Sequence, residues 1–301
     1  MWRGLASLYG MRALALALLT VSIASAQEAD TLTAADGWRS SLVASLSGNQ
    51  SSFSNWQEGG VNALSVTSSV DGVFDRVFGR VLTTQSLRLA LGALQQDTLD
   101  VRKSLDVIRY AVSAERTGGP IRPAVSASFR TQFAPGFDYA PTAEEYPDLE
   151  VVPGEELKVS DVVSPLIMTQ TVGVAYRPGG GFVGRAGLGV KETVVGIERL
   201  RPVYGNDPTE AVRVEAGLDV ELALEREVMD NVTLRSRLST FQSFSQIGSD
   251  APDVLFENVL LLKVNDIINV TLDGAVLFDA DVSQDVQLRE ALSVGLAFGL
   301  L

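Results

Sequence analysis

Charged residues recur at every second position in several stretches of this sequence, and they are its most chemically capable side chains. Residues 211–224 are the clearest case, because Arg213, Glu215, Asp219 and Glu221 are separated by apolar or small residues. Side chains along a β-strand point alternately to its two faces, so charges at this spacing share one face. The pattern predicts either structural ion pairs or a selective solute path on one enclosed polar surface. The predicted members are Arg130, Arg185, Lys191, Arg213, Glu215, Asp219, Glu221, Arg235, Arg237, Asp273, Asp279 and Arg289.

The composition excludes the commonest forms of enzyme chemistry. The chain contains no histidine and no cysteine. Histidine is the side chain that titrates near neutral pH and is a frequent metal ligand, so its absence rules out Ser-His-Asp catalysis and histidine-based metal sites. Carboxylate-only and Ser-Lys mechanisms remain open in principle. We therefore expect no enzyme activity, no cofactor and no metal.

The glycines at 179–189 have a chemical and a structural interpretation. They resemble a phosphate-binding loop in composition, but such a loop lies between a strand and a helix, and no helical pattern follows here. Gly187 and Gly189 lie on the polar face of the predicted strand, together with Arg185 and Lys191. Glycines that tighten a turn and relieve crowding inside an enclosed interior are therefore the favoured interpretation.

Two features fall in predicted loops. Asn55, Trp56 and Tyr139 lie near predicted strand ends, where aromatic residues form interfacial girdles, with ligand stacking as the alternative. Residues 136–161 are rich in carboxylates, which bind Ca²⁺ or bridge to lipopolysaccharide through divalent ions. They lack the D-x-D-x-D-G spacing of a calcium loop, so a solvated outer loop is favoured. These acids are Asp138, Glu144, Glu145, Asp148, Glu150, Glu155, Glu156 and Asp161.

The element that carries the charges in residues 211–224 is a long strand with one apolar face. All even positions from Val212 to Leu224 are apolar. A helix of this sequence would spread the charges around its whole circumference. The length exceeds that of an ordinary soluble strand and suits a tilted strand that crosses a bilayer, which takes about 9–11 residues. We therefore predict an all-β fold, namely a closed antiparallel transmembrane β-barrel.

Alternation and turn signals predict twelve strands, and bacterial single-chain barrels have even numbers. Asp71-Gly72 is predicted as the hairpin turn between the second and third strands. Tight connections alternate with longer ones, as periplasmic turns and outer loops do, and the longest connections are the irregular segments 135–160 and 198–210. The predicted strands are 38–48, 61–70, 73–94, 99–114, 123–133, 165–176, 182–197, 211–224, 232–244, 253–264, 267–280 and 286–301.

The N-terminus has the features of a secretory signal peptide. Arg3 and Arg12 precede an apolar stretch, and Ala24-Ser25-Ala26 forms a cleavage site. We therefore divide the chain into a signal peptide at 1–26, a short periplasmic segment at 27–36 and a barrel at 37–301, exported through the Sec pathway. The net charge of −13 disfavours nucleic acid as a partner.

Several motifs resemble an uncharacterised family of Gram-negative outer membranes, domain of unknown function 3078. The most specific is Thr131-Gln132-Phe133-Ala134-Pro135-Gly136-Phe137-Asp138-Tyr139, and weaker ones are Phe53-Ser54-Asn55-Trp56, Ser164-Pro165 and Met229-Asp230-Asn231-Val232. The resemblance implies an outer-membrane barrel but no established activity, so it transfers no functional residue. Such barrels usually end on an aromatic residue that the insertion machinery reads, whereas this chain ends Gly299-Leu300-Leu301.

The sequence thus predicts a barrel in the outer membrane of a Gram-negative bacterium and leaves its role open. A narrow passive channel for small polar solutes is slightly favoured over a non-conducting structural or docking barrel. The docking barrel would use its outer loops to bind a partner or a surface polysaccharide. The expected partners are outer-membrane lipid, lipopolysaccharide and, during assembly, the insertion machinery. The sequence does not specify an oligomeric state.

Overall fold

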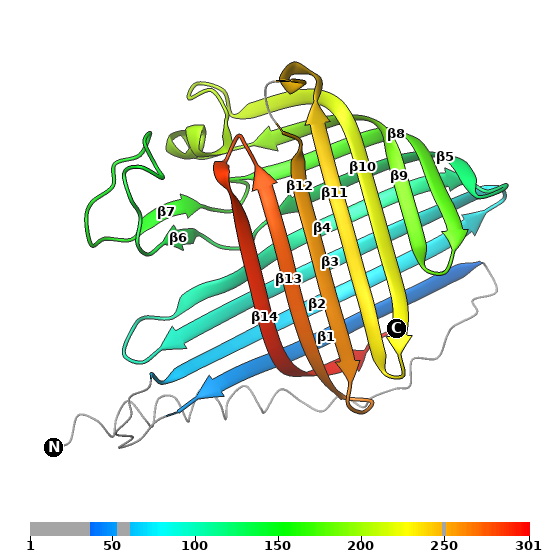
Figure 1. Cartoon of the computed structure of the whole chain (residues 1–301), viewed down its shortest axis with the longest axis horizontal. Coiled ribbons are helices and arrows are strands. Elements are labelled where there is room, and N and C mark those ends of the chain that lie inside the picture. The colour runs from blue at the N-terminus through cyan, green and yellow to red at the C-terminus, as the bar shows by residue number, and fades with distance from the viewer. Residues whose placement is uncertain (1–36, 53–60, 249–250) are drawn as a thin grey trace.

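The structure, a computed structural model, describes residues 37–52, 61–248 and 251–301. The predicted signal peptide and the periplasmic segment 27–36 lie outside these residues. Twelve strands form one closed antiparallel barrel in the order β1-β14-β13-β12-β11-β10-β9-β8-β5-β4-β3-β2. Figure 1 shows β10–β14 crossing in front of β1–β5, while β8 and β9 bend between the two walls.

The barrel strands agree with the predicted ones in number and, apart from the β2–β3 boundary and the end of β10, in position within a few residues. A further pair, β6 (Gly136–Asp138) and β7 (Leu157–Ser160), forms a two-stranded sheet in the connection between β5 and β8. The barrel strands are β1 (Trp38–Ser51), β2 (Ala63–Phe78), β3 (Val81–Gln96), β4 (Arg102–Arg116), β5 (Ile121–Thr131), β8 (Leu166–Gly179), β9 (Phe182–Val194), β10 (Val212–Met229), β11 (Val232–Ser243), β12 (Asp253–Lys263), β13 (Ile268–Asp279) and β14 (Ser283–Gly299).

The predicted turn at Asp71-Gly72 is wrong. Both residues lie inside β2, and the chain turns instead at Gly79 and Arg80. The Asp71 carboxylate faces Arg88, with 3.9 Å between the nearest charged atoms. A Cβ at Gly72 would lie only 2.9 Å from the Leu42 side chain. Asp-Gly therefore serves here for an ion pair on one face and for close packing on the other, although the dipeptide favours a hairpin turn.

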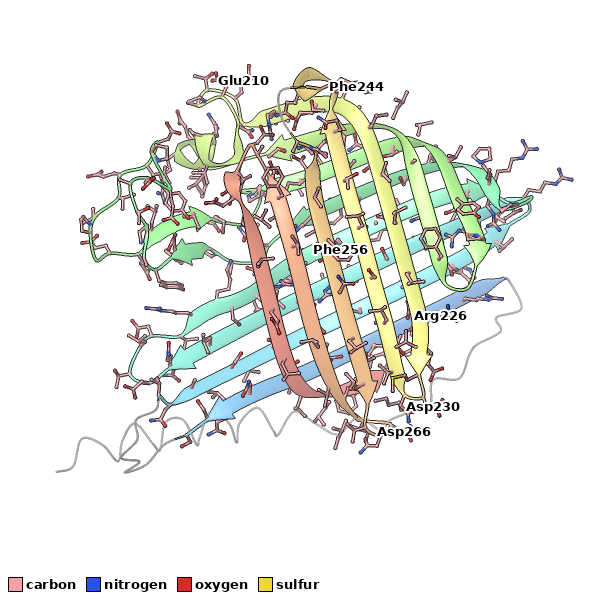
Figure 2. The ribbon with its side chains drawn as sticks, viewed as in Figure 1. Glu210, Arg226, Asp230, Phe244, Phe256 and Asp266 are labelled. Atoms are coloured by element: carbon pink, nitrogen blue, oxygen red, sulfur yellow. The ribbon has the colours of Figure 1, made fainter. Side chains whose placement is uncertain are left out.

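The apolar face of β10 lies outside the barrel and its charged face inside. Val214 and Leu218 are 62% and 47% exposed, whereas Glu215 is 7% exposed. A water-soluble core would show the reverse. Figure 2 shows Phe256 on the outer wall between the two ends of the barrel, with Asp230 and Asp266 at the turns of one end. The exposed apolar band is thus the lipid-facing surface of a transmembrane barrel.

The two ends of the barrel differ in their connections. Short turns join β2 to β3, β8 to β9 and β10 to β11, whereas the connections from β5 to β8 and from β9 to β10 are long. At the short-turn end the Arg76 guanidinium lies 4.9 Å from the ring centres of both Trp38 and Phe78. Such aromatic groups are typical of the membrane interface. By the rule for bacterial barrels, the short turns are periplasmic and the long loops extracellular.

The seam between the first and last strands is the shortest ladder in the barrel. β1 pairs with β14 over Val43–Gly48 and Val294–Gly299, whereas it pairs with β2 along its whole length from Trp38 to Ser51. The seam therefore closes the barrel with few backbone hydrogen bonds. The helices in the described ranges are short 3-10 turns, and none is long and apolar enough to span a membrane.

Candidate functional site in the barrel lumen

The inward faces of the strands bring most of the predicted charged residues together. Arg235 is separate: it pairs with Glu225 at 2.9 Å in a half-exposed position at the periplasmic end. Asp273 pairs with Arg289 at 2.7 Å and with Arg88 at 3.4 Å. Glu215 contacts Lys191 and Arg213 of the main group. The predicted residues that line one common cavity are Arg130, Arg185, Lys191, Arg213, Asp219, Glu221, Arg237 and Asp279.

An extracellular-side cluster joins β9, β10, the start of β12 and the turn between β13 and β14. Lys191 Nζ lies 3.0 Å from Glu215 and 2.5 Å from Asp253. Arg213 contacts Glu215 at 3.3 Å and also pairs with Asp281. Because Lys191 and Glu215 are both nearly buried, each compensates the desolvation of the other. The cluster ties the strand ends of two walls together.

A periplasmic-side cluster centres on Glu115, whose side chain is 1% exposed. Its carboxylate lies 2.5 Å from Arg177 and 3.2 Å from Arg185. Arg185 continues the chain to Glu221 at 2.7 Å, and Glu221 also pairs with Arg237. One buried carboxylate thus holds several guanidinium groups that would otherwise repel each other.

Between these clusters an ion pair crosses the lumen. The two terminal nitrogens of Arg109 lie 2.7 and 2.9 Å from the two carboxylate oxygens of Glu257. Arg109 is on β4 and Glu257 on β12, and five strands separate them in either direction around the barrel. This bidentate pair is the strongest hydrogen-bonding geometry available to these groups. It spans the interior from wall to wall.

Sequence reasoning missed several members of this network, above all Arg109, Glu115 and Glu257. Their signal was present, since Arg109 and Glu115 have the same parity in β4, with apolar or small residues between them. The missed partners are Asp71, Arg88, Arg109, Glu115, Arg122, Arg177, Asp253, Glu257 and Asp281.

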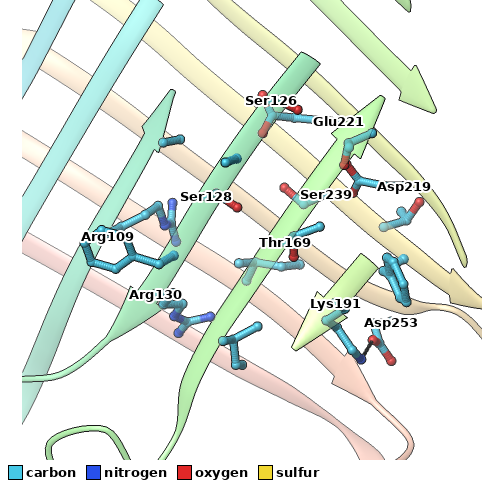
Figure 3. Close-up of a pocket in the computed structure, with 18 of the residues that line it drawn as sticks. Arg109, Ser126, Ser128, Arg130, Thr169, Lys191, Asp219, Glu221, Ser239 and Asp253 are labelled. Carbon is cyan, nitrogen blue, oxygen red and sulfur yellow. Dashed lines mark hydrogen bonds and ion pairs between the residues drawn. The ribbon is translucent and has the colours of Figure 1, made fainter. Parts of the chain in front are cut away.

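The charged walls enclose a cavity of about 250 Å³. Hydroxyl groups of Ser126, Ser128, Thr169 and Ser239 line it together with the charged residues. Figure 3 shows Arg109 and Arg130 on one side of this cavity, and Lys191 beside Asp253 on another. The interior is therefore polar and carries both signs of charge.

The outer loops fold over the cavity. Tyr204, in the 3-10 turn η2 (Pro202–Tyr204), lines the cavity and donates a 3.0 Å hydrogen bond to the Val159 carbonyl in β7. Burial raises the pKa of Tyr204 to about 12, so its hydroxyl remains a donor at neutral pH. Asn206 is buried and donates to the Thr193 carbonyl at 3.0 Å. These contacts join the two long loops to each other and to β9.

The loop 136–161 is more ordered than predicted. It contains β6 and β7, so the expectation of an irregular segment from 135 to 160 is wrong. Lys103 and Asp106 on β4 hold its start, because Asp106 accepts the Phe133 and Ala134 N–H groups at 2.7 and 2.9 Å. Asp138 accepts a hydrogen bond from Tyr146, and Lys158 pairs with Asp161. Several of these acids are thus engaged within the loop itself.

Over the described residues, one group of carboxylates is close enough to hold a cation. Asp253, Asp279 and Asp281 have oxygens within 4.8 Å of one another. Lys191 and Arg213 already neutralise Asp253 and Asp281. The group is therefore part of the ion-pair network.

The remaining predicted features are structural. Gly179, Gly180 and Gly181 have positive φ angles at the turn between β8 and β9, and a strand follows them. The phosphate-loop alternative is therefore wrong. The Arg102 guanidinium lies over the ring of Tyr139, with 4.1 Å between its central carbon and the ring centre. Asn55 and Trp56 fall outside the described residues.

Comparisons with known proteins give a family match and distant structural similarity. The family model described as "Protein of unknown function (DUF3078)" matches residues 48–137, which confirms the family resemblance over that segment. No curated protein matches the chain.

Solved structures that resemble the chain are outer-membrane barrels. One is the translocator domain of the autotransporter NalP from Neisseria meningitidis, with 11% identity, TM-score 0.36, and coverage of 97% of this chain and 95% of that one. Another is the COG4313 outer membrane channel from Pseudomonas putida F1, with 8% identity, TM-score 0.37, and coverage of 91% and 99%. Because these identities and TM-scores are low, we base the assignment of a closed barrel on the strand pairing of the structure itself.

Proposed function

We propose that this outer-membrane barrel is a narrow passive channel for small polar solutes. The observation that carries the proposal is the cavity of about 250 Å³ inside the barrel, lined by charged and hydroxyl groups from opposite walls. The cavity leaves space for a small polar solute between the charged walls. Twelve strands give an interior wider than that of eight-stranded barrels and narrower than that of 16-stranded porins.

The Arg109–Glu257 pair is the proposed constriction. It crosses the lumen with two short hydrogen bonds, at 2.7 and 2.9 Å, and both side chains are largely buried. A solute must pass beside it or displace it, and displacement would leave two unpaired charges in a partly desolvated interior. The channel is therefore expected to conduct small solutes with a low conductance.

Conductance in planar bilayers tests the proposal. The wild-type barrel should give discrete low-conductance channels. A variant with Arg109→Ser and Glu257→Ser should give a larger unit conductance, because the crossing side chains are shortened together and no charge is left unpaired. The matched control is Lys263→Ser with Asp266→Ser, an exposed ion pair at a periplasmic turn, which should conduct like the wild type. A folded barrel that stays silent in both forms would contradict the channel.

A docking barrel is the second candidate, favoured by the construction of the outer loops. The contacts of Asp106 with the chain at Phe133 and Ala134, and of Tyr204 with β7, hold the two long loops in place. Replacing residues 139–156 with a short Gly-Ser linker should leave heat-modifiable migration and conductance unchanged. Loss of a surface-binding phenotype in that variant would favour docking over transport.

We propose no catalytic role, because the chain has neither histidine nor cysteine. Export through the Sec pathway, and contact with lipopolysaccharide and with the insertion machinery, complete the proposal. Cell fractionation with and without residues 1–26 tests the export step.

A further inference from the structure

We propose that Arg130 is the binding residue for the anionic group of a small solute, a single carboxylate or phosphate, inside the lumen. The inference rests on the proposed channel function and names the class of solute that the cavity favours. It follows from the place of Arg130 in the cavity, from the ion pairs that the other cavity cations form, and from the hydroxyl groups beside Arg130.

Arg130 faces the cavity from the inner surface of β5. Its direct partners across the sheet are Arg109 on β4 and Ile167 on β8. Two residues along the same face lies Ser128, paired across the sheet with Thr169. The immediate wall around the guanidinium therefore offers another cation, an apolar side chain and two hydroxyl groups, but no carboxylate.

The structure gives Arg130 no hydrogen bond or ion pair with any described residue, which distinguishes it from the other cavity cations. Lys191, Arg185, Arg213 and Arg237 all have carboxylate partners. Arg109 is paired as well, because its terminal nitrogens occupy both oxygens of Glu257. Among the cavity cations, Arg130 is thus the one for which the described residues provide neither a hydrogen bond nor an ion pair.

A partly buried guanidinium without a hydrogen-bond partner is costly, because it has lost part of its hydration. The Glu257 carboxylate acts on Arg130 electrostatically, but both of its oxygens already accept hydrogen bonds from Arg109. A carboxylate or phosphate oxygen pair fits the planar fork of Arg in a bidentate arrangement, which supplies the missing charge and hydrogen bonds. The hydroxyl groups of Ser128 and Thr169 line the same cavity and lie next to Arg130 on the wall. They can donate to the remaining oxygens of the bound anion.

The other charges of the cavity limit what can bind. Asp219 and Asp279 also line it without an ion-pair partner in the described ranges, and Asp219 accepts a 2.6 Å hydrogen bond from Thr171. They lie on β10 and β13, away from the Arg130 wall. Their negative charge disfavours a second anionic group, so the site suits a solute with one anionic group. The interior is enclosed by the barrel wall, which makes a free solute rather than a lipid headgroup the source.

Calorimetric titration of the purified full-length barrel in detergent tests the site, with sodium acetate and inorganic phosphate as probes and acetamide as the neutral analogue. Acetate and phosphate should bind at one site and acetamide should not. Arg130→Gln should weaken acetate binding by about tenfold or more, because charge-assisted hydrogen bonds are lost. The matched control is Arg235→Gln. Arg235 was also predicted to face the lumen, but it is half exposed and already paired with Glu225. This variant should bind acetate like the wild type.

Thermal unfolding of the unsubstituted barrel provides a second measurement that does not depend on a variant. Acetate should raise the unfolding temperature and acetamide should not, because a ligand that binds only the folded state stabilises it. Equal effects of acetate and acetamide, or unchanged acetate binding in Arg130→Gln, would overturn the inference. Conductance without acetate binding would overturn the inference and leave the channel standing. Acetate binding in a barrel that does not conduct would overturn the channel and retain the site.

Discussion

The wall formed by β8, β9 and β10 and the seam between β1 and β14 are built in opposite ways. Along the wall, β9 and β10 pair from Phe182 to Val194, and Lys191–Glu215 and Arg185–Glu221 reinforce the ladder from inside. The seam pairs over Val43–Gly48 alone on the β1 side, and its inward residues there are uncharged. Side-chain charges thus stabilise the wall, whereas the seam depends on backbone hydrogen bonds.

The wall of β8, β9 and β10 also contains pairs of glycines where the sheet bends. Gly173 on β8 lies directly opposite Gly187 on β9, and Gly189 lies opposite Gly217 on β10. A Cβ at Gly173 would lie 2.1 Å from the Ala186 carbonyl oxygen. The bend that carries the sheet from one wall to the other (Figure 1) therefore needs glycine on its inner surface. The comparison teaches that the barrel concentrates its specific side-chain interactions at the bend.

The largest expected effect is the loss of Glu115, the β4 carboxylate that pairs with Arg177 on β8 and Arg185 on β9. Glu115→Ala removes a side chain that is 1% exposed and leaves Arg177 and Arg185 without their shared partner. We expect the free energy of unfolding to fall by about 3–5 kcal/mol, as for other buried pairs that lose one member. Urea unfolding in detergent, followed by heat-modifiable migration, measures the change. The control, Glu225→Ala, breaks a half-exposed pair and should cost under about 1 kcal/mol. Similar losses in both variants would contradict the contrast between buried and exposed pairs.

A smaller effect is expected for a methyl group added at the bend. Gly173→Ala should lower the free energy of unfolding by about 1–3 kcal/mol, because the new Cβ meets backbone atoms that cannot move without opening the ladder. Gly274→Ala is the matched control, since a Cβ there would lie 4.0 Å from the nearest atom, the Arg289 carbonyl oxygen. The same unfolding assay compares the two. If Gly274→Ala is the more harmful variant, close approach is not the reason for glycine at the bend.

The smallest expected effect is local opening of the seam between β1 and β14, which can be measured in the folded barrel. The backbone amides that pair Val43–Gly48 with β14 should exchange with solvent deuterium faster than those paired between β9 and β10, because a short ladder opens locally at lower cost. Ser45 and Ala297 are directly paired and the chain has no native cysteine, so a double cysteine variant can cross-link the seam. The cross-link should slow exchange at the seam and leave the β9–β10 amides unchanged. Equal exchange at the two places before cross-linking would remove the contrast.

The architecture was accessible from the sequence because a membrane barrel has a strict local rule. Lipid demands an apolar residue at every second position, and the pattern in residues 211–224 satisfies this over a length that only a membrane strand needs. The wrongly predicted turn at Asp71-Gly72 shows the limit of local signals. Turn preference is a property of two residues, while the ion pair with Arg88 and the packing against Leu42 depend on strands that the dipeptide does not specify.

The alternation of apolar and polar residues by itself determined the strands, their number and which side chains face inward. Only the tertiary structure decided which inward charges meet, because Arg109 and Glu257 are 148 residues apart and lie opposite each other only once the barrel is closed. The pairing of β4 with β5 places Arg130 beside Arg109, and the closed barrel gives Arg130 no hydrogen bond or ion pair with a described residue. Period two is a property of each strand alone, whereas a contact across the lumen depends on the order, tilt and register of all twelve.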